Sequence, residues 1–343
     1  MTAQGPLTIS IAMCTYNGAR FLPEQLDCLA KQSRLPDEVV ICDDCSSDNS
    51  VEILNAWAKS VPFSVKIVQN EKNLGYAQNF AKAISLCSSD VIFLSDQDDI
   101  WTSDKLEKMT SVFDDRPEVG VVFCDGLCVD TQGNTLNRLA SDIARPGMIC
   151  GRPYYLYWKP VRKGMHFFGC CCAIRKSVWD KIAPLPESFT HDLWIFLAAQ
   201  AISEIVYLPD TLTHYRLHES NTSAVSPDSS DKMTGEYFQT FYKTATGLFF
   251  YNHAMAEDFQ SWLEKQERSP QIAAALSFLK SEDRHFNNRS RCQRNIWLFF
   301  PLWIWEIVSG GYCRRLQPIQ SIAYDFRTGV RNGLNFGSKK INE

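Results

Sequence analysis

The chain has 343 residues, a formal net charge of -4 at pH 7 and 45% hydrophobic residues. This length allows one large or two modest domains with a buried core. The weakly acidic charge argues against a general nucleic-acid binder, which usually carries a basic face. The sequence shows no signal peptide and no run of about 20 apolar residues that would span a bilayer. We therefore expect a cytoplasmic protein that does not bind nucleic acid.

The first part of the chain alternates between strand-like and helix-like segments. We expect strands at 7–13, 38–42, 65–68 and 91–94, and helices at 22–32, 50–59 and 76–86. Strands that alternate with helices form βαβ units with right-handed crossovers. The pattern therefore predicts an α/β protein with a parallel sheet.

The middle of the chain continues with less regular elements. We expect helices at 105–114 and 190–201, and strands at 120–130, 166–174 and 205–208, with a polar segment at 131–163. Asp104 precedes Glu107 by three residues, which predicts an N-cap with a capping box for the helix from 105.

The C-terminal part differs in composition. A Ser- and Pro-rich stretch at 223–230 indicates a boundary, and the pattern from 237 to 279 is helical throughout. We therefore expect a catalytic domain at 1–225 and a helical region at 226–343. The segment 296–305 is strongly apolar and aromatic, and arginines flank it. Such a segment either lies on a membrane surface as a peripheral anchor or packs on the catalytic domain, and the sequence leaves both open.

The 13 cysteines follow no repeating spacing. Cys42 and Cys45 form the only C-x-x-C pair, and no second pair stands at the spacing of a zinc site. Free cysteine behaves as a small buried hydrophobic residue, and most of these cysteines lie in or beside apolar runs. We therefore expect a reducing compartment and no zinc.

An acidic cluster follows the apolar run at 91–94. Asp96 and Asp98 are two residues apart, so on an extended backbone their side chains point the same way. Converging carboxylates suit a hard cation such as Mg²⁺ or Mn²⁺ that holds a diphosphate. The alternative for such a cluster is a solvated turn or a helix cap.

Three strand ends are expected to form one pocket, because the carboxyl ends of parallel strands meet at one edge of the sheet. The residues at these ends are Thr15, Tyr16 and Asn17, then Asp44, then Asp96 and Asp98. Tyr16 and backbone groups can grip a base, and Asp44 can accept a hydrogen bond from it. Asp96 can reach a ribose hydroxyl or the metal, which Asp98 holds. No G-x-G-x-x-G follows the first strand, which argues against a dinucleotide-dependent oxidoreductase.

Taken in order, the segments 10–17, 39–48 and 93–99 resemble the family 2 glycosyltransferases with the GT-A fold. The resemblance covers about residues 7–223. The form Asp-Gln-Asp-Asp-Ile-Trp at 96–101 is most similar to bacterial rhamnosyltransferase-like enzymes, which build surface polysaccharides such as O-antigen and capsule.

The resemblance implies further site residues. Asp192 matches the catalytic base of the family, although His191 stands where Glu or Asp is more common. His218, in the late loop 215–223, is implied to complete the metal site or to contact the diphosphate. Asn79 falls near the donor contacts of the family.

These roles imply a metal-dependent, inverting sugar transfer. Asp192 would accept the proton of an acceptor hydroxyl, while the metal neutralises the departing diphosphate. The expected donor is dTDP-β-L-rhamnose, which would give an α-linked product, and the expected acceptor is a saccharide or a lipid-linked saccharide. A UDP-hexose or UDP-N-acetylhexosamine donor is the alternative. A catalytically silent subunit of a polysaccharide assembly complex is the alternative from another class.

Overall fold

The structure is a computed structural model that describes residues 5–140, 168–219, 221, 253–277 and 279–280. The chain divides into two compact units, one of residues 1–144 and 165–230, the other of residues 145–164 and 231–343. The predicted division into domains at residue 225 remains a prediction.

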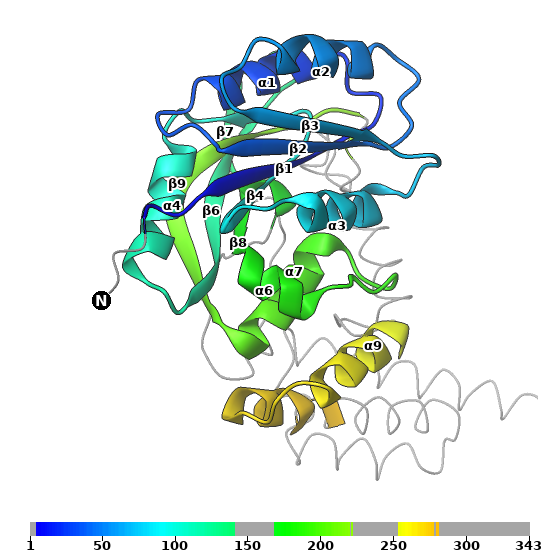
Figure 1. Ribbon diagram of the computed structural model, residues 1–343, viewed down its shortest axis with the longest axis vertical. Coiled ribbons are helices and arrows are strands. Elements are labelled where there is room, and N and C mark those ends of the chain that lie inside the picture. The colour runs from blue at the N-terminus through cyan, green and yellow to red at the C-terminus, as the bar shows by residue number, and fades with distance from the viewer. Residues whose placement is uncertain (1–4, 141–167, 220, 222–252, 278, 281–343) are drawn as a thin grey trace, which may run out of the picture. The chain divides into compact units, whose positions relative to one another are not determined.

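A mixed β-sheet forms the centre of the first unit (Figure 1). Over the described residues its strand order is β3-β2-β1-β4-β8-β6-β9-β5, and β7 pairs with β6. The strands are β1 (Ile9–Thr15), β2 (Glu38–Asp43), β3 (Ser64–Gln69), β4 (Val91–Ser95), β5 (Ile100–Trp101), β6 (Val119–Val129), β7 (Thr135–Leu139), β8 (Cys172–Arg175) and β9 (Glu204–Arg216). The first four strands are parallel, as predicted.

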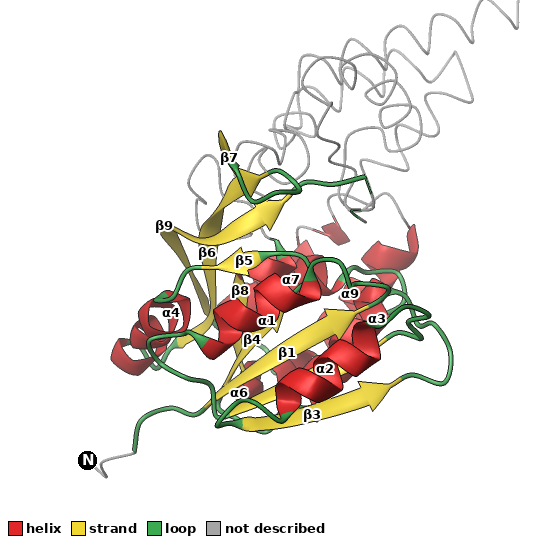
Figure 2. Cartoon of the chain, turned by 90° about the horizontal axis from the view of Figure 1, so that it is seen from above, coloured by secondary structure: helices red, strands yellow, loops and turns green. Residues whose placement is uncertain are grey.

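Helices cover this sheet. They are α1 (Leu22–Ala30), α2 (Ser50–Ala58), α3 (Tyr76–Leu86), α4 (Lys105–Asp115), α6 (Lys176–Ile182) and α7 (His191–Ile202). Helices α1 and α2 lie on one side of β1–β3 and α3 lies on the other (Figures 1 and 2). Every residue of β1 and of β4 is therefore buried, which explains their continuous apolar sequences.

Several predictions for the second half of the sheet need correction. Within the predicted strand 166–174, the described part begins with a 3-10 turn at Gly169–Cys171 and becomes a strand only from Cys172. Strand β9 is much longer than the predicted 205–208, and β5 and β7 were not predicted at all. The two-residue β5 exists because it pairs with His214 and Thr213, far away in the sequence.

The capping prediction for α4 is wrong. Asp104 does occupy the N-cap position, but its side chain makes no cap hydrogen bond. Its carboxylate instead accepts a hydrogen bond from Thr102 Oγ1 and pairs with Lys108. The Asp104 carboxylate is therefore engaged by two nearby side chains instead of by a backbone amide in the first turn of α4.

In the second unit, α9 (His253–Glu264) is followed by a non-helical stretch at 265–269 and by a helix at 270–277. The prediction of helix throughout 237–279 is therefore confirmed for these two helices and wrong at 265–269. The predicted boundary at 223–230 and the aromatic segment 296–305 lie outside the described residues. Across the described part of the chain, every helix is too short or too polar to cross a membrane. Every cysteine that the structure describes is a free thiol.

Candidate active site

A cavity of about 910 Å³ opens where β1 and β4 end. It brings together the side chains that the sequence predicted for the donor and the metal: Thr15, Tyr16, Asn17, Asp44, Asn79, Asp96, Asp98 and His218. The predicted base, Asp192, is not among the described residues that line it.

Asp98 and His218 meet in this cavity from positions 120 residues apart. His218 Nε2 lies 2.7 Å from Asp98 Oδ2, and both side chains are mostly buried. The imidazole is held against the ring of Phe21, with 4.8 Å between the centroids. The carboxylate and the imidazole are therefore placed next to each other, as a shared ligand would require.

Asp96 and Asp99 place two further carboxyl groups beside Asp98. Burial, then the charges of Asp99 and Asp98, raise the pKa of Asp96 well above its usual value. Burial, then the charge of Asp98, raise the pKa of Asp99 to about 7. Asp99 Oδ2 is buried without a hydrogen-bond partner among the described residues. Crowded carboxylates with a free oxygen fit a divalent cation, which would relieve their repulsion.

Two details of the predicted metal site differ in the structure. The chain bends at residues 97–98 after β4, so the argument from an extended backbone was wrong, although Asp96 and Asp98 both line the cavity. The potential ligand atoms of Asp96, Asp99 and Cys170 lie within 4.8 Å of one another. Thiolate is a soft ligand that suits Mg²⁺ and Mn²⁺ poorly, so we favour the carboxylates and His218. The sequence analysis left Asp99 without a role, although it directly follows Asp98.

Gln97 connects the acidic cluster to the loop after β1. Its Oε1 accepts a hydrogen bond from Tyr16 N at 2.8 Å, and its Nε2 donates to Tyr16 O at 3.0 Å. Both hydrogen bonds use backbone groups, so Gln97 holds the loop much as a strand neighbour would. Tyr16 itself remains 50% exposed.

Asp44 and Asn79 are buried in the wall of the cavity, and other protein groups already occupy their polar atoms. Asp44 accepts hydrogen bonds from Leu74 N at 2.8 Å and from Gly75 N at 2.9 Å. Asn70 donates to both Asp44 and Asn79. In the structure Asp44 holds the turn before α3, and Asn79 links Asn70 to the backbone at the end of β2. The sequence did not predict these roles, and the predicted donor contacts of both residues remain predictions.

Asp192 opens α7 outside the cavity lining. Its Oδ1 accepts a hydrogen bond from Leu193 N at 2.8 Å. Burial, then the nearby Asp192 charge, raise the pKa of Tyr76, which lines the cavity. The Tyr76 ring lies 6.1 Å from the ring of His191, the neighbour of Asp192, so the start of α7 lies beside the α3 side of the cavity.

The neighbouring His191 is buried and stacked on Phe80 at 4.2 Å between centroids. Neither of its ring nitrogens has a hydrogen-bond partner among the described residues. Burial lowers the pKa of His191, so the ring is held in its neutral form.

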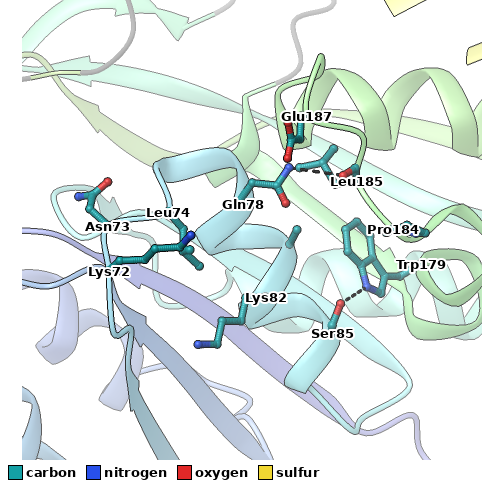
Figure 3. A pocket seen from close by; sticks show the side chains of 11 residues that line it. Lys72, Asn73, Leu74, Gln78, Lys82, Ser85, Trp179, Pro184, Leu185 and Glu187 are labelled. Atoms are coloured by element: carbon teal, nitrogen blue, oxygen red, sulfur yellow. Dashed lines mark hydrogen bonds between the residues drawn. The ribbon is translucent and has the colours of Figure 1, made fainter. Parts of the chain in front are cut away.

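A second, more open hollow of about 560 Å³ lies along α3 (Figure 3). Gln78 donates to Leu185 O across it, and Trp179 donates to Ser85 Oγ (Figure 3). Its described lining includes none of the predicted site residues. The candidate chemistry therefore belongs to the larger cavity.

Comparison with known proteins finds relatives of this chain and solved structures that share its fold. An uncharacterized glycosyltransferase of Nostoc sp. is 26% identical over 255 residues, which cover 68% of this chain and 76% of the Nostoc protein. The dTDP-rhamnosyl transferase RfbG of Shigella flexneri is 36% identical over 99 residues, covering 28% of this chain and 34% of RfbG.

A crystal structure of S. aureus TarS residues 1–349, in complex with UDP-GlcNAc, shares the fold with a TM-score of 0.53. The similarity covers 82% of this chain and 73% of the TarS chain at 19% identity. The predicted GT-A architecture is thereby confirmed. Residues 10–182 match the family described as glycosyl transferase family 2, which spans about half of the chain and includes β1–β4 and the acidic cluster. The chain therefore belongs to glycosyl transferase family 2.

Proposed function

We propose that this glycosyltransferase is metal-dependent and inverting, and that it takes its sugar from a nucleotide donor. The observation that carries the proposal is the contact between Asp98 and His218, beside Asp96, in a cavity at the carboxyl ends of β1 and β4. Ligands of open α/β sheets bind at this edge.

Asp96, Asp98 and His218 would hold Mg²⁺ or Mn²⁺. When bound, the cation neutralises charge on the diphosphate of the donor. The loop at Thr15, Tyr16 and Asn17 binds the base. Gln97 fixes that loop relative to the acidic cluster, which supports simultaneous binding of base and diphosphate.

Asp192 is proposed as the general base. It accepts the proton of the acceptor hydroxyl as that oxygen attacks the anomeric carbon, and the bond to the diphosphate breaks on the opposite side. Its half-buried position in the first turn of α7, next to His191, whose ring lies 6.1 Å from that of Tyr76 in the cavity lining, supports access to an acceptor. Attack opposite the leaving group inverts the anomeric carbon, so a β-linked donor gives an α-linked product.

We propose dTDP-L-rhamnose as the donor, on the similarity to the dTDP-rhamnosyl transferase of Shigella flexneri. A UDP-hexose or UDP-N-acetylhexosamine is the alternative, since the fold is shared with a protein crystallised with UDP-GlcNAc. The acceptor is proposed to be a saccharide or lipid-linked saccharide of bacterial surface polysaccharide synthesis. The presence of the full acidic set argues against a catalytically silent subunit, and that set is Asp44, Asp96, Asp98 and Asp192.

Calorimetry with a panel of donors tests this proposal. The panel contains dTDP-rhamnose, UDP-glucose, UDP-galactose, UDP-N-acetylglucosamine and GDP-mannose, each titrated with Mn²⁺ and then with EDTA. Binding of dTDP-rhamnose alone, and only with Mn²⁺, is the expected result. Preference for a UDP-sugar would overturn the rhamnose assignment and leave the mechanism, whereas no binding would favour the silent subunit.

A further test concerns the membrane contact of segment 296–305, which the sequence left open. Deletion of the residues after 295 removes the aromatic segment 296–305 and should reduce sedimentation of the chain with anionic liposomes. Unchanged sedimentation of a soluble truncated chain would count against a membrane contact.

A further inference from the structure

Arg216, the last residue of β9, is 1% exposed and makes hydrogen bonds to three separate loops or helices. Its Nε donates to Asp98 O at 2.8 Å, within the acidic cluster. Its Nη1 donates to Thr131 O at 3.0 Å and to Asp130 O at 3.3 Å, after β6. Its Nη2 pairs with Glu24 of α1.

The same residue also supports His218. The Arg216 Cζ lies 5.0 Å from the centroid of the Phe21 ring, and this ring also contacts the imidazole of His218. Arg216 O accepts a hydrogen bond from Asn221 Nδ2 at 3.0 Å, and Asn221 Oδ1 accepts one from His218 N. Arg216 therefore touches the supports of both Asp98 and His218.

The stability of the fold alone does not account for this arginine. Burial of a guanidinium is costly unless its charge is paired and its donors are satisfied. The side chain of Glu24 is 50% exposed, so the ion pair with Arg216 is partly screened by solvent. The remaining donors of Arg216 are satisfied by carbonyls of segments that line the cavity or adjoin it. This arrangement uses the planar fork of arginine, which lysine lacks.

We propose that Arg216 is the positioning residue of the cation site and sets the placement of Asp98 relative to His218. This inference rests on the proposed metal-dependent function. Residues that orient metal ligands typically change metal affinity about 10–100-fold when they are replaced. The sequence showed Arg216 only as part of the late loop and gave it no role.

Arg175 offers a matched control within the same unit. Its Nε donates to Val119 O at 2.8 Å, its Nη2 donates to Phe113 O at 2.7 Å, and its Cζ lies 5.1 Å from the Phe113 ring. Arg175 is therefore also held by carbonyls and an aromatic ring. It pairs with Val91 at the start of β4, the end opposite to the acidic cluster.

The experiment compares Mn²⁺ binding to the wild-type chain, Arg216→Lys and Arg175→Lys by electron paramagnetic resonance, with a thermal melt of each protein. We expect Arg216→Lys to weaken Mn²⁺ binding about tenfold or more. Arg175→Lys should lower the melting temperature and leave Mn²⁺ affinity unchanged. Wild-type affinity in Arg216→Lys, or an equal loss of affinity in both variants, would overturn the inference.

Two further outcomes are distinguishable. If the wild-type chain binds no Mn²⁺, the metal dependence in the proposed function fails and the inference falls with it. If Arg216→Lys does not fold, Glu24→Gln decides, because it neutralises the carboxylate that pairs with Arg216 Nη2. A loss of Mn²⁺ affinity of about threefold or more in Glu24→Gln supports the inference, and an unchanged affinity overturns it.

Discussion

The two halves of the sheet differ in regularity and in what they contribute to the site. Strands β3, β2, β1 and β4 are parallel and pair without a register shift. Strands β8, β6, β9 and β5 mix parallel and antiparallel pairs, and the β6–β9 pairing shifts register three times. The regular half presents the loop after β1 and the acidic cluster, while the irregular half adds Arg216 and the following His218.

This difference shows how a common frame acquires a specific site. Parallel strands with helical crossovers place their loops at one edge whatever those loops contain. Register shifts bend and twist a strand locally, so they direct individual side chains. The long β9 ends at Arg216, whose Nε donates to Asp98 O in the acidic cluster, and His218 follows two residues later.

The largest effect is expected at the contact between the two halves of the sheet, where Asp98 meets His218. Asp98→Ala removes the carboxylate that meets His218, so metal-dependent sugar transfer should fall to the rate seen in EDTA while the fold persists. Initial rates with Mn²⁺ and a thermal melt measure this. Asp27→Ala, which alters an exposed pair with Lys31, serves as the control and should keep full activity. Substantial transfer by Asp98→Ala would refute the metal assignment.

Asp192→Asn tests the proposed general base in the first turn of α7, the helix that precedes β9. Loss of a general base should lower kcat by about 10²–10⁴. The affinity for the donor should stay the same, because Asp192 lies outside the cavity lining. Steady-state kinetics and donor calorimetry separate the two quantities. A parallel loss of donor affinity would indicate that Asp192 binds the donor instead.

A smaller effect is expected from the contact between the loop after β1 and the acidic cluster. A methyl group at Gly18 would overlap Oε1 and Cδ of Gln97, which hold Tyr16. A displaced Gln97 would lose its two hydrogen bonds to Tyr16, each worth about 0.5–1.5 kcal/mol, so Gly18→Ala should weaken donor binding about tenfold. The double variant Gly18→Ala with Gln97→Ala should bind the donor no worse than Gln97→Ala alone. Additive losses would show that Gly18 acts independently of Gln97.

The smallest expected effect is the pH dependence of stability from His191. Burial lowers the pKa of His191 in the folded chain, so below about pH 6.5 the unfolded chain binds a proton that the folded chain does not. Stability that is present above this pH is lost as the pH falls toward the lowered pKa. In His191→Asn the melting temperature should therefore drop by a few degrees less than in the wild type between about pH 7.5 and 5.5. Equal drops in the melting temperatures of the two proteins would contradict a lowered pKa of His191 in the folded chain.

Local patterns were sufficient for the regular half. The prediction for residues 76–86 matches α3 residue for residue, and the four parallel strands were found within a few residues. Fully buried strands read as short apolar runs, and crossover helices read as periodic segments, so both leave a local signal. The convergence of Asp98 and His218 in one cavity was inferred from strand order together with the family resemblance.

Long-range contacts decided the rest. Lys105, in the first turn of α4, is fully buried and donates to Cys170 O at 2.6 Å and to Thr213 Oγ1 at 2.8 Å. The hydrogen-bond partners of its side chain stand at least 65 residues away in the chain, and only the Trp101 ring, 3.7 Å from its Nζ, is a local contact, so its burial depends mainly on distant segments. The same reason applies to β5, which exists only as a partner of β9.

By itself, the sequence determined the α/β frame, the edge at which the site lies and the family, because strand periodicity and motif order are local properties of the chain. Only the tertiary structure decided three features of the site. The turn before α3 donates to Asp44, Asp99 lies within the electrostatic influence of Asp98, and Arg216 donates to the backbone of the acidic cluster. Burial and hydrogen-bond partners depend on which distant segments meet, and that is settled only when the sheet is assembled.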